Sequence, residues 1–309
     1  MTRFVVGAYP ASIAHKSWNA TAEHEFFSLL GSDSRISALE LPWLGDIHPH
    51  DPSWLHQNFP TNLKAVVTSI PYVMSRFGQN PKYGLASTDN DGRKGAIGDV
   101  AKILQAIKEF NEFSNRKVVS AVEIHTAPRA IGSLDALALS LDEISQWDWQ
   151  GAELVIEHCD ALVDGQVPEK GFLTLEDEIS AIKKSGVDIG LLINWGRSAI
   201  EFRDGDRVIN HIELAKSNDL LHGLIFSGVS DAETDFGPAW IDAHLPFTEP
   251  RSLLTSDRLK NALQIAGPIS LLGIKMGWPP GITGTVQQRF NSISDALSLI
   301  QTAQFDTRV

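Results

Sequence analysis

Three stretches of the sequence decide the fold: VVSAVEIH (Val118–His125), ELVIEHCD (Glu153–Asp160) and DIGLLINW (Asp188–Trp195). Each is a short run of aliphatic and β-branched residues that ends in polar side chains. Runs of four to eight apolar residues are typical of buried strands. Each run is followed by a longer stretch with apolar residues at helical spacing, so the pattern predicts parallel strands joined by helices.

The same alternation recurs along the whole chain. Five further runs have the character of strands: FVVGAY (Phe4–Tyr9), ISALELPW (Ile36–Trp43), KAVVTSI (Lys64–Ile70), LLHGLIFSG (Leu220–Gly228) and SLLGIKM (Ser270–Met276). Helical spacing is found in the stretches 22–30, 94–112, 134–147, 174–184, 207–217, 256–265 and 292–302, with a weak short helix near 53–57. Eight strand–helix units predict an α/β protein: a single (β/α)8 TIM barrel over residues 1–309. An open doubly wound sheet is the alternative, but GAYPAS replaces the G-x-G-x-x-G turn after the first strand.

The composition excludes several classes of protein. Hydrophobic residues make up 43% of the chain and charged residues 21%, which are ordinary values for a globular protein. The net charge of −12 argues against a nucleic-acid or anionic-membrane partner. No apolar stretch approaches a membrane span. The single cysteine, Cys159, excludes an intrachain disulfide and fits a cytoplasmic protein. An oligomer is compatible with the sequence.

Two connections that follow predicted strands are long and rich in Gly, Pro and polar residues. They are residues 71–93, after the third strand, and residues 228–255, after the seventh. On a barrel, both would lie at the C-terminal rim, where the active sites of this fold are built. We expect the segment 228–255 to close over the site.

Charged and polar side chains interrupt five of the apolar runs near their C-terminal ends. Because residues two apart in a strand share a face, Glu123, Asn194 and Lys275 are expected to point into the barrel beside small residues, and Glu157 by the same logic. An unpartnered buried charge is unfavourable, so several of them at one rim indicate an active site, with a structural ion network as the alternative. The predicted catalytic residues are Glu123, Glu157, Lys275 and His125.

Further polar and aromatic side chains near the strand ends are candidates for substrate binding. The tract DIHPHD (Asp46–Asp51) has the His-x-His pattern of some metal sites, which is also common in solvated loops. Three tryptophans follow strand ends, where an indole face suits the C–H face of a sugar ring or packs the rim. His158 lies out of phase with Glu157 and is expected to orient a neighbour. The substrate-binding candidates are Glu40, Trp43, His48, His50, His158, Asp160, Asn194, Trp195, Arg197, Ser227 and Trp278.

The segments LELPW, DIHPHD, AVEIHTAPR, ELVIEHCD, INWGRSAIE and FGPAW resemble, over nearly the whole chain, a family of bacterial TIM-barrel proteins of unknown function. More distantly, the architecture is similar to the xylose-isomerase-like superfamily of sugar isomerases, epimerases and endonuclease-four-type enzymes. That resemblance implies a divalent metal held by Glu on strand five, Asp on strand six, His or another polar ligand on strand seven and Glu on strand eight. Here Glu157 fits the first position, whereas Asn194, Ser227 and Lys275 stand at the others. The ligand set is incomplete, so any metal would rely on Glu157, and Lys275 is expected to replace the positive charge of the metal.

These residues and the resemblance predict an intracellular carbohydrate-active enzyme, a sugar isomerase or epimerase, with a small sugar or sugar derivative as its partner. Proton removal beside a carbonyl needs a base, an acid and a positive group near the enolate oxygen. Glu157 and Glu123 are expected to supply the base and the acid respectively, and Lys275 and His125 the stabilising groups. Arg197 is expected to hold an anionic or hydroxylated end of the substrate.

Three alternatives remain open from the sequence. A glycoside hydrolase needs two carboxyl groups flanking the scissile bond, and Glu123 and Glu157 on adjacent strands are compatible with that. A Schiff-base aldolase or lyase would use the amine of Lys275. A non-catalytic sugar-binding barrel would keep the aromatic side chains without the chemistry.

Overall fold

The computed structural model describes residues 3–306 and contains a closed barrel of eight parallel strands in the order β1 to β8. The strands are β1 (Phe4–Gly7), β2 (Ile36–Pro42), β3 (Lys64–Thr68), β4 (Val119–Ile124), β5 (Glu153–His158), β6 (Gly190–Asn194), β7 (Leu221–Phe226) and β8 (Leu271–Lys275). Each strand pairs with the next one along the chain, and β8 pairs with β1. The predicted (β/α)8 TIM barrel is confirmed.

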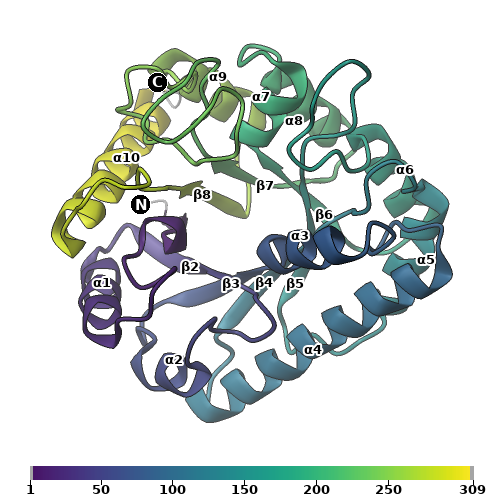
Figure 1. Cartoon of the computed structure of the whole chain (residues 1–309), viewed down its shortest axis with the longest axis horizontal. Helices are drawn as coiled ribbons and strands as arrows, with labels where there is room; N and C mark the ends of the chain where they lie inside the picture. The colour runs from purple at the N-terminus through teal and green to yellow at the C-terminus, as the bar shows by residue number, and fades with distance from the viewer. Residues whose placement is uncertain (1–2, 307–309) are drawn as a thin grey trace.

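Helices surround the barrel, as Figure 1 shows. They are α1 (Ala20–Ser32), α2 (Pro52–Asn58), α3 (Ile70–Gln79), α4 (Asn90–Ser114), α5 (Leu134–Ser145), α6 (Leu175–Ser185), α7 (Trp195–Phe202), α8 (Val208–Ser217), α9 (Ser256–Ala266) and α10 (Val286–Asp306). A short 3-10 turn, η1 (Tyr9–Ala11), follows β1. The helical spacing in the sequence found eight of these helices but missed α3 and α7. Within the described residues, no helix combines the length and hydropathy that crossing a bilayer requires.

The stretch 71–93 is not the continuous loop that its composition predicts. Helix α3 begins at Ile70, directly after β3, and has Pro71 in its first turn. Proline is favourable at this position because its fixed φ suits a helix and its missing N–H would have had no intrahelical partner. The irregular chain is therefore confined to residues 80–89, before α4. The segment 227–255 after β7, by contrast, contains no helix or strand of the described structure beyond isolated bridges.

The sequence Asn194-Trp195-Gly196-Arg197 does not continue the sixth strand as expected. The strand β6 ends at Asn194, whose side-chain oxygen accepts a hydrogen bond from the Arg197 backbone N–H at 3.4 Å and so caps α7. Asparagine favours this position because its short side chain satisfies an N–H group left free at the start of the helix. Arg197 therefore lies on the first turn of α7, above the barrel.

The interior of the barrel is an apolar layer with one residue from each strand. Its members are Val5, Ala38, Val66, Ala121, Val155, Leu192, Ile225 and Leu271. Side chains two residues further along a strand have the same inward direction, one layer closer to the C-terminal mouth. Glu40, Glu123, Glu157 and Asn194 occupy that next layer, and all four are buried. The apolar layer is therefore the floor of a polar chamber.

Candidate active site

The carboxylate of Glu157 is held from three sides at the mouth of the barrel. Its Oε2 lies 2.6 Å from Nη1 of Arg197 and 2.9 Å from Nε2 of His125, and its Oε1 accepts a hydrogen bond from Nδ2 of Asn194 at 3.0 Å. Burial alone would raise the pKa of Glu157, but Arg197, Lys275 and His125 lower it well below its usual value. Glu157 is therefore a fixed anion.

A second buried ion pair joins β8 to β2. The ammonium nitrogen of Lys275 lies 2.5 Å from Oε1 of Glu40 and 5.1 Å from the centre of the Tyr9 ring. Burial would lower the pKa of Lys275, but Glu40, Tyr9 and Glu157 raise it well above its ordinary value. Lys275 is therefore charged, as we expected of a group that takes the place of a metal. The pKa of Glu40 is raised by burial, against the opposing effect of Lys275.

Glu123 differs from both of its acidic neighbours because it has no cationic partner. Neither carboxyl oxygen has a hydrogen-bond partner among residues 3–306, although the side chain is fully buried. Burial, together with the negative charges of Glu40 and Glu157, raises the pKa of Glu123 well above its usual value. Glu123 is therefore a neutral carboxylic acid at pH 7, with a proton available for donation.

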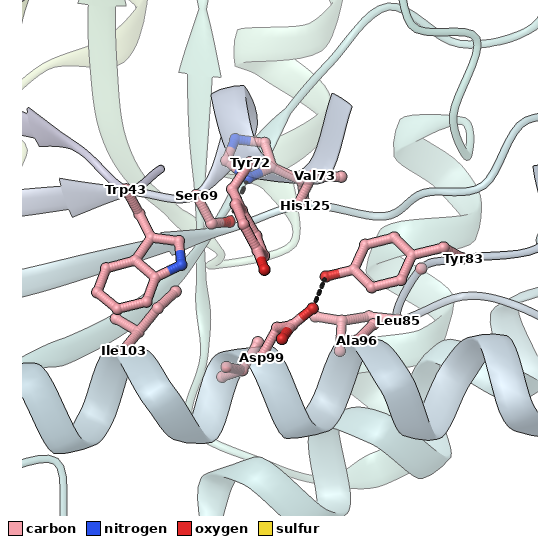
Figure 2. Close-up of a pocket in the computed structure, with 12 residues that line it drawn as sticks. Trp43, Ser69, Tyr72, Val73, Tyr83, Leu85, Ala96, Asp99, Ile103 and His125 are labelled. Atoms are coloured by element: carbon pink, nitrogen blue, oxygen red, sulfur yellow. Dashed lines mark hydrogen bonds between the residues drawn. The ribbon is translucent and has the colours of Figure 1, made fainter. Parts of the chain in front are cut away.

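His125 links this chamber to a small pocket between α3 and α4. Its Nδ1 lies 2.9 Å from the hydroxyl of Ser69, as Figure 2 shows, while its Nε2 faces Glu157. Burial lowers the pKa of His125 to about 4, so the ring is neutral. Trp43 lines the same pocket, and its indole Nε1 has no hydrogen-bond partner in the described part of the chain. The structure thus places Trp43 beside His125, not beside the glutamates.

A second cavity reaches Glu40 from the side of β1 and β2. It is lined by Tyr9 and Glu40 at one end and includes His48 and His50. The two histidines pack around Trp18: the centre of the His48 ring is 5.0 Å from it and that of His50 is 5.6 Å. Burial lowers the pKa of His48 to about 4. These two candidates therefore share a cavity with Glu40 and also serve as packing residues.

Several other predicted residues are positioned differently. Asp160 accepts hydrogen bonds from the backbone of Lys170 and shapes the loop after β5. Trp195 is buried in the core cluster outside the barrel. Trp278 donates from Nε1 to the carbonyl of Ile282 and stacks against Arg289. The hydroxyl group of Ser227 forms a hydrogen bond with Nδ1 of His244. None of these contacts brings the two tryptophans to the glutamates.

His158 lies outside the chamber because it faces the helices. Its Nδ1 is 2.9 Å from Glu178 and its Nε2 is 3.1 Å from Glu201. Burial would lower the pKa of His158, but Glu178 and Glu201 raise it to about 10. The residue is therefore a buried imidazolium between two carboxylates, on the face of β5 away from Glu157, as the strand parity predicts.

The chamber does not fit a divalent metal bound as the superfamily resemblance implies. At the expected ligand positions, the Asn194 amide already donates to Glu157, and the Lys275 ammonium carries a positive charge of its own. Elsewhere in the described residues, one group of side chains has ligand atoms within 4.8 Å of one another: His158, Glu201 and His211. A metal there would have to displace the proton that binds His158 to Glu201.

Residues that the sequence reasoning missed complete the chamber. Tyr9 lies two residues beyond β1, where the strand parity that located Glu123 could have found it. Ser69 lies within the predicted strand Lys64–Ile70 but is the N-cap residue of α3 in the structure. Lys170 and Asp242 come from irregular segments after β5 and β7, and their ammonium and carboxylate groups are 2.7 Å apart. No sequence pattern singles out either of these two.

Comparisons with known proteins agree with this architecture. The chain is 35% identical over 311 residues to the protein named Uncharacterized protein STM3670 from Salmonella typhimurium LT2, with 98% of each chain covered. Among solved structures, it is similar to a xylose isomerase domain containing protein from the same organism, with a TM-score of 0.61, 11% identity and 97% of each chain covered.

Two further solved structures have comparable similarity. An IolI protein with a bound zinc atom has a TM-score of 0.61 and 12% identity, with 98% of this chain and 99% of that one covered. A D-allulose 3-epimerase from Methylomonas has a TM-score of 0.58, 12% identity and the same coverage. At these low identities, the structural similarity shows a shared TIM-barrel fold. Residues 5–291 match the family described as Domain of unknown function (DUF4862), and the chain belongs to that family.

Proposed function

We propose that this protein is a sugar isomerase or epimerase that moves a proton between carboxyl groups with an ammonium group in place of a metal. The observation that carries the proposal is the environment of Glu123: a fully buried carboxyl group with both oxygens unpartnered in the described structure, near the Lys275–Glu40 ion pair. Burial and the neighbouring carboxylates raise its pKa, which favours the neutral form. A neutral acid next to a fixed positive charge is suited to enolate chemistry.

The proposed reaction begins with removal of a proton from the carbon next to the substrate carbonyl. Glu40 is the proposed base because burial raises its pKa, and a more basic carboxylate accepts a proton more readily. The electron pair of the C–H bond moves into the carbonyl, and Lys275 stabilises the negative oxygen of the enolate. Glu123 then delivers its proton to the opposite face of the same carbon while the enolate re-forms its carbonyl, which gives an epimer. Delivery to the former carbonyl carbon gives an isomer when the proton of the neighbouring hydroxyl moves to the enolate oxygen and the electron pair of that O–H bond forms the new carbonyl.

This assignment changes the role expected of Glu157. Three donors bind its carboxylate, and its pKa is lowered well below the usual value, so it is a weak base. We propose that Glu157 instead positions His125 and Arg197 around the substrate. The charged state of Lys275 likewise disfavours a Schiff base, because the nucleophile in that chemistry is the neutral amine.

The similarity to an epimerase and to a xylose isomerase domain protein supports a small sugar as substrate. One observation favours a second candidate: the neutral Glu123 and the anionic Glu157 on adjacent strands have the protonation states of the two carboxyl groups in a retaining glycoside hydrolase. The single, buried Cys159 remains the basis for proposing a cytoplasmic enzyme.

A product analysis tests the proposal. The purified chain is incubated with aldoses, ketoses and hexuronates in the presence of EDTA, and the products are separated by chromatography. Interconversion by the wild type, lost in Glu123→Gln, supports the proposal. Release of nitrophenol from nitrophenyl glycosides without interconversion would support the hydrolase instead, and binding without either reaction would indicate a non-catalytic barrel.

A further inference from the structure

The carboxylate of Asp242 occupies a cationic cradle above the chamber. Asp242 belongs to the irregular segment 227–255, and its Oδ2 accepts hydrogen bonds from Nε of Arg197 at 3.0 Å and Nζ of Lys170 at 2.7 Å. Its Oδ1 lies 3.2 Å from Nδ1 of His244. Burial would raise the pKa of Asp242, but Lys170, His244 and Arg197 lower it well below the usual value.

Arg197 connects this cradle directly to the chamber. The same guanidinium binds Asp242 through Nε and Glu157 through Nη1. A group bound in the place of Asp242 would therefore contact the same guanidinium group that binds Glu157.

The groups at the centre of the chamber are closed to solvent in this structure. Lys275 and Glu123 have 0% exposure and Glu157 has 1%, so a substrate reaches them only after the covering chain moves. Asp242 belongs to the segment 227–255, which forms no helix or strand and is held by scattered backbone hydrogen bonds such as those between Gly228 and Leu245. Opening would carry the carboxylate away from Arg197 and Lys170.

Movement of Asp242 would change the charges around Arg197 and Lys170. In the closed state, the carboxylate of Asp242 is shared by Arg197 and Lys170. Glu157 also pairs with Arg197, and the buried carboxylate of Asp160 binds the backbone N–H of Lys170. Near the ammonium group of Lys170, Glu169 lies 3.9 Å away, but its side chain is 33% exposed and its charge is screened by water. Departure of Asp242 therefore leaves the ammonium group of Lys170 without its close carboxylate, which is unfavourable.

We infer that Asp242 holds the place of a substrate carboxylate, and that the substrate is a sugar acid. This inference rests on the proposed function and names its substrate class. A carboxylate on the sugar would give Lys170 a close carboxylate again by accepting the hydrogen bonds that Arg197 and Lys170 gave to Asp242. Arginine suits this role because its planar fork matches a carboxylate. A phosphate dianion would carry one charge more than Asp242 does, so the carboxylate is favoured.

Calorimetric titration of the full chain tests the inference. The ligands are D-glucuronate and D-galacturonate, their neutral counterparts D-glucose and D-galactose, and D-glucose 6-phosphate, all at constant ionic strength. We expect the uronates to bind about tenfold or more tightly than the neutral sugars. Asp242→Asn removes the competing carboxylate while keeping its size, and should tighten uronate binding without tightening the binding of neutral sugars.

Lys170→Met removes one cation of the cradle and keeps the backbone N–H that binds Asp160. It should abolish most of the preference for the uronates. The matched control is Lys184→Met, which breaks the exposed pair of Lys184 with Asp135 on the outer helices and should leave that preference unchanged.

The inference is overturned if the neutral sugars bind as tightly as the uronates, if the phosphorylated sugar binds more tightly than both, or if neither wild type nor Asp242→Asn binds a uronate. The proposed function has a separate readout, since product formation is measured on the same samples. Interconversion of neutral sugars only would leave the proposed function standing without the substrate class. Uronate binding without any conversion would support the substrate class and contradict the proposed function.

Discussion

Lys275 on β8 and Glu40 on β2 form an ion pair that passes over the intervening strand β1, at the position of Gly7. A Cβ atom at Gly7 would lie 2.6 Å from Oε2 of Glu40 and 2.8 Å from Cγ of Lys275. Real Cβ atoms do not approach other atoms so closely. The missing side chain of Gly7 therefore creates the space in which the two charges meet.

Gly7→Ala should disrupt that pair. Overpacking of a closed core costs about 1–3 kcal/mol, so we expect a lower free energy of unfolding and loss of sugar conversion. The matched control is Gly98→Ala in α4, where nothing lies within 4 Å of the added atom. That variant should be unchanged or more stable by up to about 1 kcal/mol, since alanine favours helix. Chemical denaturation measures both, and an unaffected Gly7→Ala would contradict the tight fit.

Glu123→Gln should abolish activity and leave the fold equally stable or more stable. Unfolding frees Glu123 to ionise near its ordinary pKa, whereas the folded state keeps it neutral, so above that pKa the unfolded state binds fewer protons. The contribution of Glu123 to stability thus falls by about 1.4 kcal/mol per pH unit as the pH rises. In Glu123→Gln, residue 123 does not titrate and makes no pH-dependent contribution to stability. Denaturation of both proteins from pH 5 to 8 should show an advantage of the variant that grows with pH.

Glu157→Gln should behave in the opposite way. Removing this anion leaves the buried guanidinium of Arg197 with Asp242 as its remaining carboxylate. Breaking a buried ion pair costs about 3–5 kcal/mol, so the free energy of unfolding should fall clearly below that of the wild type. If Glu157→Gln were as stable as Glu123→Gln, Glu157 would not be the fixed anion that its three hydrogen bonds indicate.

His158 should make stability depend on pH above neutrality. Its pKa is about 10 in the folded protein and near 6.5 when unfolded. A raised pKa stabilises the folded state fully below pH 6.5, and this stabilisation is lost as the pH rises to about 10. The difference in unfolding free energy between wild type and His158→Gln should therefore shrink over that range. A constant difference would mean that His158 is neutral in the folded state.

The barrel and much of the chamber could be predicted from the sequence, because local geometry alone decides which face of a strand a residue lies on. Alternation within short apolar runs was sufficient to direct Glu123, Glu157, Asn194 and Lys275 inward. The same reasoning placed Trp195 in the sixth strand, whereas the cap formed by Asn194 begins helix α7 at that residue.

The sequence could not predict the side chains that irregular loops bring to Arg197 and to each other. Asp242 and Lys170 are 72 residues apart and lie outside any periodic element, so only the folded loops bring them together. Protonation states were equally inaccessible. Glu123 and Glu157 look alike in the sequence, and the presence or absence of Arg197 beside each carboxyl group decides which one is neutral.

Lys275→Met should remove activity in a way that added Mn²⁺ or Mg²⁺ does not restore, because the methionine side chain cannot stabilise an enolate and the remaining ligands do not form a metal site. Treatment of the wild type with a carbonyl sugar and borohydride should leave no covalent adduct, since the amine is charged. Mass spectrometry of the treated protein checks this. An adduct on Lys275 would point to the aldolase chemistry instead.

Solvent exchange tests the metal-free proton transfer most directly. EDTA-treated wild type and Glu123→Gln are incubated in D₂O with the sugars and sugar acids named above, and proton NMR follows the C–H signals next to the carbonyl. We predict that the wild type forms an interconverted product that carries one deuterium at the reacting carbon and that Glu123→Gln forms this labelled product at least about a hundredfold more slowly. Equal formation of the labelled product by both proteins, or formation by the wild type only after a divalent metal is restored, would contradict proton transfer through Glu123 beside a lysine.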